Sequence, residues 1–120
     1  MATAYSTNPQ PYILKEDREK DEEHQSVFQL KGLTNEQWDN LVPKMWGKNT
    51  ESINLLGSSA TKIVKMILKG WDNFKDENGD DIEFSQKMSD NLNRLSAGMR
   101  MEFALEAINR QQLTEDESKN

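Results

Sequence analysis

The sequence predicts a mainly α-helical protein: a small helical domain with one short β-hairpin, a short N-terminal strand and flexible termini. Apolar residues recur every three or four positions between residues 53 and 71 and again between 92 and 108, which is the spacing of one helix face. An Asn78-Gly79 pair lies in an acidic stretch, as in a two-residue hairpin turn. Hydrophobic residues make up only 34% of the 120 residues. Some stretches, expected at the termini, therefore bury too little apolar area to offset their ordering entropy.

Residues 1–24 are predicted to form a flexible, charged N-terminal arm. Pro9 and Pro11 lie in a segment without a helical or strand period, and Lys15–His24 holds six acidic and three basic residues. This mixture is typical of a solvated linker or a short exposed helix. Between these two parts, Tyr12 and Ile13 form either a short strand or an extended adhesive segment.

The helical domain is expected over residues 25–112, and it starts with the short strand. Phe28 and Leu30 alternate with polar residues over 26–31, which is the pattern of a half-buried strand. Thr34 and Gln37 have the spacing of a capping box that begins a helix. Pro43 lies inside this helix and predicts a kink or an early stop.

A longer helix is predicted to begin after Thr50 or Ser52 and to end near Gly70, because glycine is favoured just beyond a helix C-terminus. A final helix is expected from Ser89 or Ser96 through Arg110, with Gly98 as a point where it splits. Residues 113–120 form an acidic C-terminal tail.

A hairpin is predicted at residues 71–85, where a calcium loop is the competing interpretation. With Gly79 at the sixth position of an EF-hand loop, Phe74 takes the first ligand position and Ser85 replaces the bidentate glutamate. The calcium loop is therefore rejected in favour of a type I′ turn at Asn78-Gly79. This turn places Lys75 opposite Ile82 and returns the chain to Trp71, which is expected in the core.

Composition and motifs argue against several classes of function. A net charge of -6 repels phosphate backbones, so nucleic acid is not an expected partner. No apolar run approaches the ~20 residues of a membrane span. The chain has no Cys and one His, His24, and no phosphate-binding glycine loop. We therefore expect no enzymatic activity, no catalytic residue, no cofactor and no metal site.

Binding to a protein partner through apolar surface remains as the expected function. Methionine and tryptophan are adaptable or anchoring residues at such surfaces. Met45 and Trp46 lie shortly after Pro43, and Met99 and Met101 lie just after Gly98. The candidate partner-binding residues are Trp46, Met45, Met99, Met101, Tyr12 and Ile13.

The order of several segments resembles small morphogenesis proteins of tailed bacteriophages, most closely the tail assembly chaperone group. The segments are VFQLKGLT, KGWDNFKDENGDDIEFS, DNLNRLSAGMRMEFALEAI and the terminal LTEDESKN. The sharpest part of the resemblance comprises Gly70, Trp71, Asn73, Phe74, Gly79, Phe84 and Ser85. The resemblance covers about Val27–Asn120.

This resemblance implies a non-enzymatic protein that binds other phage proteins in the host cytoplasm. A tail assembly chaperone covers apolar or helical segments of the tape-measure protein until the tail tube forms around them. The alternative is a permanent virion component, such as a decoration or head–tail connector protein, that docks through its N-terminal arm. Mature particles contain such a component and lack a chaperone.

Overall fold

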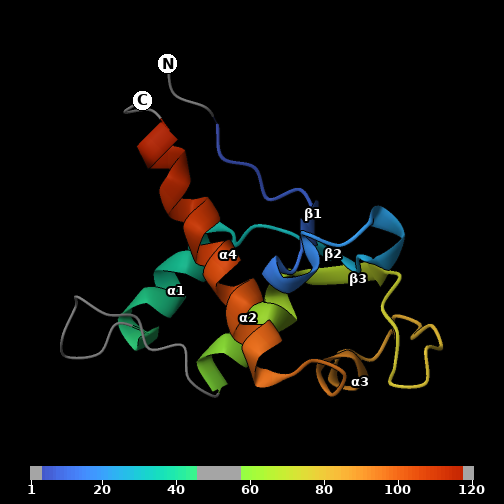
Figure 1. Ribbon diagram of the computed structural model, residues 1–120. Helices are drawn as coiled ribbons and strands as arrows, with labels where there is room; N and C mark the ends of the chain where they lie inside the picture. Colours follow the sequence, from blue (N-terminus) through green and yellow to red (C-terminus); the bar gives the residue numbers. More distant parts are fainter. Residues whose placement is uncertain (1–3, 46–57, 118–120) are drawn as a thin grey trace.

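The protein combines helices with a sheet of three antiparallel strands, in the order β1-β2-β3 (Figure 1). The computed structural model describes residues 4–45 and 58–117. The elements in chain order are β1 (Gln10–Ile13), the 3-10 turns η1 (Lys15–Asp17) and η2 (Glu22–His24), β2 (Val27–Leu30), α1 (Asn35–Met45), α2 (Ser58–Ile67), β3 (Leu68–Asp72), α3 (Met88–Leu92) and α4 (Ala97–Glu117).

The prediction of a mainly helical domain with one hairpin is wrong, because the described residues form an α+β domain. The central strand β2 confirms the strand predicted near residues 26–31, but it has a partner on each side. Tyr12 of β1 lies opposite Phe28, and Phe28 lies opposite Trp71 of β3. Residues 10–24, predicted to belong to a flexible arm, are therefore part of the packed domain, and Leu14 and Asp17 are buried there.

An aromatic row crosses one face of the sheet and forms the centre of the core. Residues that lie opposite one another on neighbouring strands point to the same face of the sheet. Tyr12, Phe28 and Trp71 are such opposite residues, so their side chains stand side by side. Phe103 of α4 packs on this row, with its ring centroid 4.8 Å from that of Phe28. Helix α4 also packs against α2, and buried residues of both helices belong to the same core cluster as the aromatic row.

The capping box predicted at the start of α1 is confirmed. The Gln37 backbone N–H donates to Thr34 Oγ1 at 3.1 Å, and the Thr34 backbone N–H donates to Gln37 Oε1 at 2.9 Å. These bonds satisfy donors that the first helical turn leaves without intrahelical partners. Helix α1 then continues through Pro43 to Met45.

Helix α2 passes directly into β3 and ends three residues before Gly70, near which its end was predicted. The predicted start of this helix, after Thr50 or Ser52, lies outside the described residues. The helix ends at Ile67 and the strand begins at Leu68. Gly70 lies inside the strand and pairs with Gln29, while a register shift next to Leu30 leaves Lys69 without an opposite residue. The Lys31 N–H donates to Ile67 O at 2.8 Å and ties the joint to the end of β2.

The predicted type I′ hairpin at residues 71–85 is also wrong. Trp71 belongs to the sheet, and the reversal beyond it has one bridge, which pairs Lys75 with Asp81 instead of Ile82. Gly79 has a φ of +84°, whereas Asn78 has no positive φ; a type I′ turn requires both. The Gly79 N–H donates to Asp76 O at 3.0 Å, so the turn spans residues 76–79.

The final helical region splits into two pieces, as predicted, but residues 93–96 separate them and Gly98 does not. Gly98 lies in the first turn of α4. Helix α4 ends at Glu117, seven residues beyond the predicted Arg110, so residues 113–117 extend the helix instead of forming a separate tail. Arg110 donates to Leu30 O, and Gln111 donates to Leu33 O, which holds α4 against the end of β2.

Candidate partner-binding site

The six predicted partner-binding residues lie in different environments. Trp46 lies outside the described residues, and Met45 is the last residue of α1. Tyr12 is buried with 7% of its surface exposed, so its side chain belongs to the core. Ile13, Met99 and Met101 are half-buried, and both methionines pack against the core from α4. Of these, Met99 lines a hollow of the surface.

This hollow, named the Met99 hollow, lies between the β1–β2 connection, the segment after β3 and the start of α4. Its volume is about 320 Å³. The apolar part of its lining comes from three separate segments: Leu14, Phe74 and Met99. Glu16, Lys20, Glu23 and Lys75 add charged side chains to the lining, and His24 adds an imidazole. An apolar lining with a charged rim is the arrangement that receives an anchoring side chain of a protein partner.

Asn73 fixes one wall of the Met99 hollow. Its backbone has a φ of +57°, a conformation that asparagine tolerates better than most residues. Its side-chain Nδ2 donates to Glu23 O at 2.9 Å and to Gln25 O at 3.1 Å. Ser26 Oγ donates to Asn73 O at 2.8 Å. These bonds join the end of the β1–β2 connection to the segment after β3, although about fifty residues separate them in sequence.

Asp17 fixes the opposite part of the β1–β2 connection. Its carboxylate is buried and accepts from the Ser26 backbone N–H at 3.2 Å and from Lys20 Nζ at 2.9 Å. The hydrogen bond to Asp17 raises the pKa of the Lys20 ammonium. A buried carboxylate with these partners is satisfied, so it stabilises the loop and is not available for a ligand.

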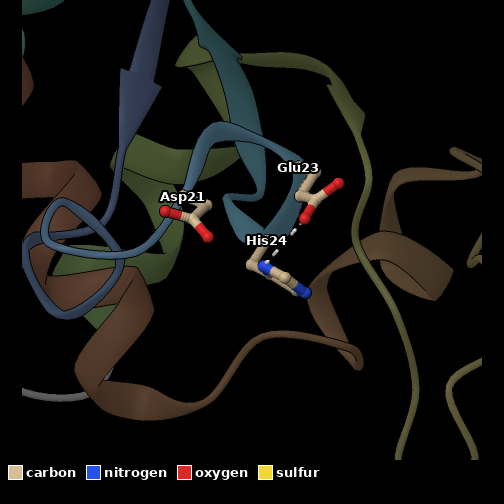
Figure 2. A group of neighbouring side chains, drawn as sticks. All are labelled: Asp21, Glu23 and His24. Atoms are coloured by element: carbon tan, nitrogen blue, oxygen red, sulfur yellow. Dashed lines mark ion pairs between the residues drawn. The ribbon is translucent and has the colours of Figure 1, made fainter.

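Three potential metal ligands lie close together in the β1–β2 connection (Figure 2), and two of them, Glu23 and His24, also line the Met99 hollow. Asp21, Glu23 and His24 each offer one ligand atom, and these atoms lie within 4.8 Å of one another. His24 Nδ1 is 3.8 Å from Glu23 Oε1. An imidazole and two carboxylates suit Zn²⁺ or a similar transition metal. All three side chains are exposed, however, and exposure leaves such ligands hydrated and free to rotate. This group was missed in the sequence, although three ligand-type residues within four positions were the available signal.

Tyr12 joins β1 to α4 beside the Met99 hollow. Its hydroxyl donates to Glu102 Oε2 at 2.6 Å, and the Lys15 backbone N–H donates to the same oxygen at 2.9 Å. Burial and then the hydrogen bond to Glu102 raise the pKa of the Tyr12 hydroxyl. The Arg18 guanidinium lies 5.3 Å from the Tyr12 ring centroid, within the range of a cation–π contact. Tyr12 therefore has a structural role and does not act as an exposed docking residue.

A second, larger hollow lies between the reversal after β3 and α3. Its volume is about 470 Å³, and its lining is mostly polar, with four carboxylates and one guanidinium: Asp76, Asp81, Glu83, Asp90 and Arg94. Asn91 at its base is buried and exchanges two bonds with Ser85, through Ser85 N–H to Oδ1 and Nδ2–H to Ser85 O, each at 2.8 Å. This second hollow contains none of the predicted residues and little apolar surface. The Met99 hollow is therefore the better candidate for a protein partner.

Comparison with known proteins assigns no family to the chain. No protein-family model, curated protein or solved structure matches it. Within residues 4–45 and 58–117, no helix has both the length and the apolar character needed to cross a membrane.

Proposed function

We propose that the protein is a non-enzymatic assembly factor that binds another protein, with the Met99 hollow receiving an apolar side chain of the partner. The observation that supports this function is the joint lining of Leu14, Phe74 and Met99 inside a charged rim. These residues come from three parts of the chain, and the hydrogen bonds of Asn73 and Asp17 hold two of those parts in place. A hollow that is formed before binding lowers the ordering cost of association.

The resemblance to tail assembly chaperones directs this proposal to the tape-measure protein of a tailed phage, bound in the host cytoplasm. Two of the residues that carry the resemblance line the Met99 hollow. Asn73 fixes the wall of the hollow, and Phe74 lines it. Trp71 and Phe84 pack against each other with ring centroids 4.9 Å apart. The resemblance therefore overlaps the proposed site at Asn73 and Phe74.

The alternative, a virion component that docks through a free N-terminal arm, has less support. Residues 10–13 of that arm are an edge strand, and Tyr12 and Leu14 are buried. Docking by insertion of these residues into a neighbour would require them to leave the core. Mass spectrometry of purified particles separates the two functions, because a chaperone is absent from mature virions and a structural component is present in fixed copy number.

Capture of the tape-measure protein tests the proposal directly. The chain is co-expressed with helical segments of the tape-measure protein of its own phage, and the captured fraction is measured by pull-down. Met99→Glu places a charge in the apolar lining and should weaken capture by ~2 kcal/mol or more, as for a central interface residue. Gln112→Glu, which changes an exposed residue of the same helix by the same charge, should leave capture unchanged. Thermal melts of both variants establish that they fold.

Equal capture by wild type and a folded Met99→Glu variant would remove the Met99 hollow from the proposal. Equal losses in Met99→Glu and Gln112→Glu would assign the effect to net charge. If no tape-measure segment is captured by the wild-type chain, the chaperone function is rejected.

A further inference from the structure

We infer that Asn78 is a site of spontaneous deamidation and that the carboxylate of Asp76 holds this reaction in check. The inference is independent of the proposed function. In an Asn–Gly pair the Gly backbone nitrogen can attack the side-chain amide carbon of the Asn. As the new nitrogen–carbon bond forms, the attacking nitrogen gives its proton to solvent; the bond from the amide carbon to the side-chain nitrogen then breaks, and this nitrogen takes up a proton from solvent and leaves as ammonia. Water then opens the resulting succinimide at either carbonyl and yields aspartate or isoaspartate at position 78.

The reacting groups are adjacent, and neighbouring side chains do not shield them. Asn78 and Gly79 are both exposed, and among the described residues none forms a hydrogen bond with the side-chain amide of Asn78. A Cβ added at Gly79 would meet no atom within 4 Å. Gly79 therefore offers an unhindered nitrogen, which is the feature that makes Asn–Gly more reactive than other Asn pairs.

The turn nevertheless ties down the attacking nitrogen. The Gly79 N–H donates to Asp76 O at 3.0 Å. The side chain of the same Asp76 accepts through Oδ1 from the Asn78 N–H at 2.9 Å and from the Asp80 N–H at 3.0 Å. Attack on the Asn78 side chain requires the Gly79 nitrogen to leave its hydrogen bond and rotate. The reaction must therefore proceed from a locally opened turn, whose population the Asp76 carboxylate lowers.

The product would change the chemistry of the turn. A carboxylate at position 78 would stand among Asp76, Glu77, Asp80 and Asp81, with Lys75 as the nearby cation that pairs with Asp81. Isoaspartate would also lengthen the backbone by one methylene between the donors that Asp76 now holds. The original set of hydrogen bonds cannot form again around that longer backbone, so deamidation removes the constraint that slowed it.

The test measures deamidation of the folded, full-length chain at mildly alkaline pH by peptide mass mapping and by isoaspartyl methyltransferase labelling. Asp76→Ala removes the acceptor of two backbone bonds, and it should raise the rate at Asn78 by about tenfold because the open turn becomes more populated. Glu77→Ala removes the same charge from the same turn without removing a hydrogen bond, and its rate should equal that of wild type. Asp76→Asn keeps an acceptor oxygen, and its rate should stay close to that of wild type.

A second comparison does not depend on any variant. Wild-type chain in denaturant should deamidate at Asn78 faster than the native chain under the same buffer conditions, because the turn is absent. Equal rates in the two states would show that the turn gives no protection, and an unreactive Asn78 in denaturant would show that it is not a site. Equal acceleration by Glu77→Ala and Asp76→Ala would assign the effect to charge and overturn the role of the Asp76 acceptor.

Discussion

Trp71 shows how one side chain joins the sheet to the segment that follows β3. Only 8% of its surface is exposed, and its ring packs edge-on against Phe28, Phe74 and Phe84. Its Nε1 donates to Ile82 O at 2.7 Å. We expect Trp71→Ala to lower the free energy of unfolding by ~3–5 kcal/mol, because it leaves a cavity and an unsatisfied carbonyl. Denaturant unfolding followed by circular dichroism measures this change.

Trp71→Phe separates packing from hydrogen bonding at the same position. It keeps an aromatic ring and removes only the donor to Ile82 O, so the loss should be limited to about 1–3 kcal/mol. A loss as large as that of Trp71→Ala would place the stabilisation in the hydrogen bond and not in the ring contacts.

At the scale of elements, the bond from Tyr12 to Glu102 ties strand β1 to helix α4. Burial and this bond raise the pKa of the Tyr12 hydroxyl in the folded protein above its ordinary value of about 10. The neutral hydroxyl is thus favoured by folding. Its stabilising contribution is complete below the unfolded-state pKa and is lost as pH rises above about 10 toward the folded-state pKa. Unfolding midpoints between neutral and strongly alkaline pH should therefore fall more steeply in wild type than in Tyr12→Phe.

Tyr5 provides the matched control for this pH effect. The chain has two tyrosines, and Tyr5 donates to the backbone oxygen of Leu33 at 2.7 Å. Burial also raises the pKa of Tyr5, but its hydroxyl donates to a backbone carbonyl and not to a carboxylate. Tyr5→Phe should consequently flatten the alkaline loss less than Tyr12→Phe does. Identical slopes in wild type and Tyr12→Phe would contradict the role assigned to the Tyr12–Glu102 bond.

Elements whose apolar spacing fits only one kind of secondary structure could be predicted from the sequence. An element whose spacing fits both a helix and a strand could not. Strand β2 and the capping box of α1 follow from neighbouring residues alone and were predicted correctly. The β3 residues Leu68 and Trp71 continue the three-or-four spacing of α2, and Gly70 imitates a helix stop. Their membership of a sheet depends on pairing with β2, which lies about forty residues earlier. Tertiary pairing therefore overrides the local signal.

The candidate site was only partly predictable for the same reason. Met99 was predicted as a binding residue because of its chemistry, and it does line a hollow. Leu14 and Phe74 were not predicted as its neighbours, because Asn73, Ser26 and Asp17 bring their segments together through hydrogen bonds. Side-chain bonds to distant backbone carbonyls leave no periodic trace in a sequence.

At the scale of the whole molecule, the net charge of -6 makes carboxylate repulsion a general destabilising term. We expect a modest rise in melting temperature with ionic strength, because salt screens repulsion between exposed charges. Calcium should give the same rise as magnesium at equal ionic strength. Among the described residues, the acidic turn after β3 brings no three carboxylates close enough to hold one ion, and calcium needs several such oxygens.

A stabilisation specific to calcium, several degrees beyond that of magnesium, would contradict this expectation and restore the rejected calcium loop. Substitution of Asp76 would then show whether its Oδ1, which now accepts two backbone bonds, is the ligand.

The direct passage from α2 to β3 restricts the positions at which residues can be inserted or deleted during evolution. Ile67 ends the helix and Leu68 begins the strand, so no intervening residue can absorb an insertion. One added residue would either rotate α2 by about 100° relative to the sheet or turn the β3 side chains to the opposite face. The rotation of α2 would remove Ile63 and Ile67 from the core, and the change of face in β3 would remove Trp71 from the aromatic row. Insertions and deletions in homologous chains should therefore avoid this junction and accumulate in connections such as the turn at residues 76–79.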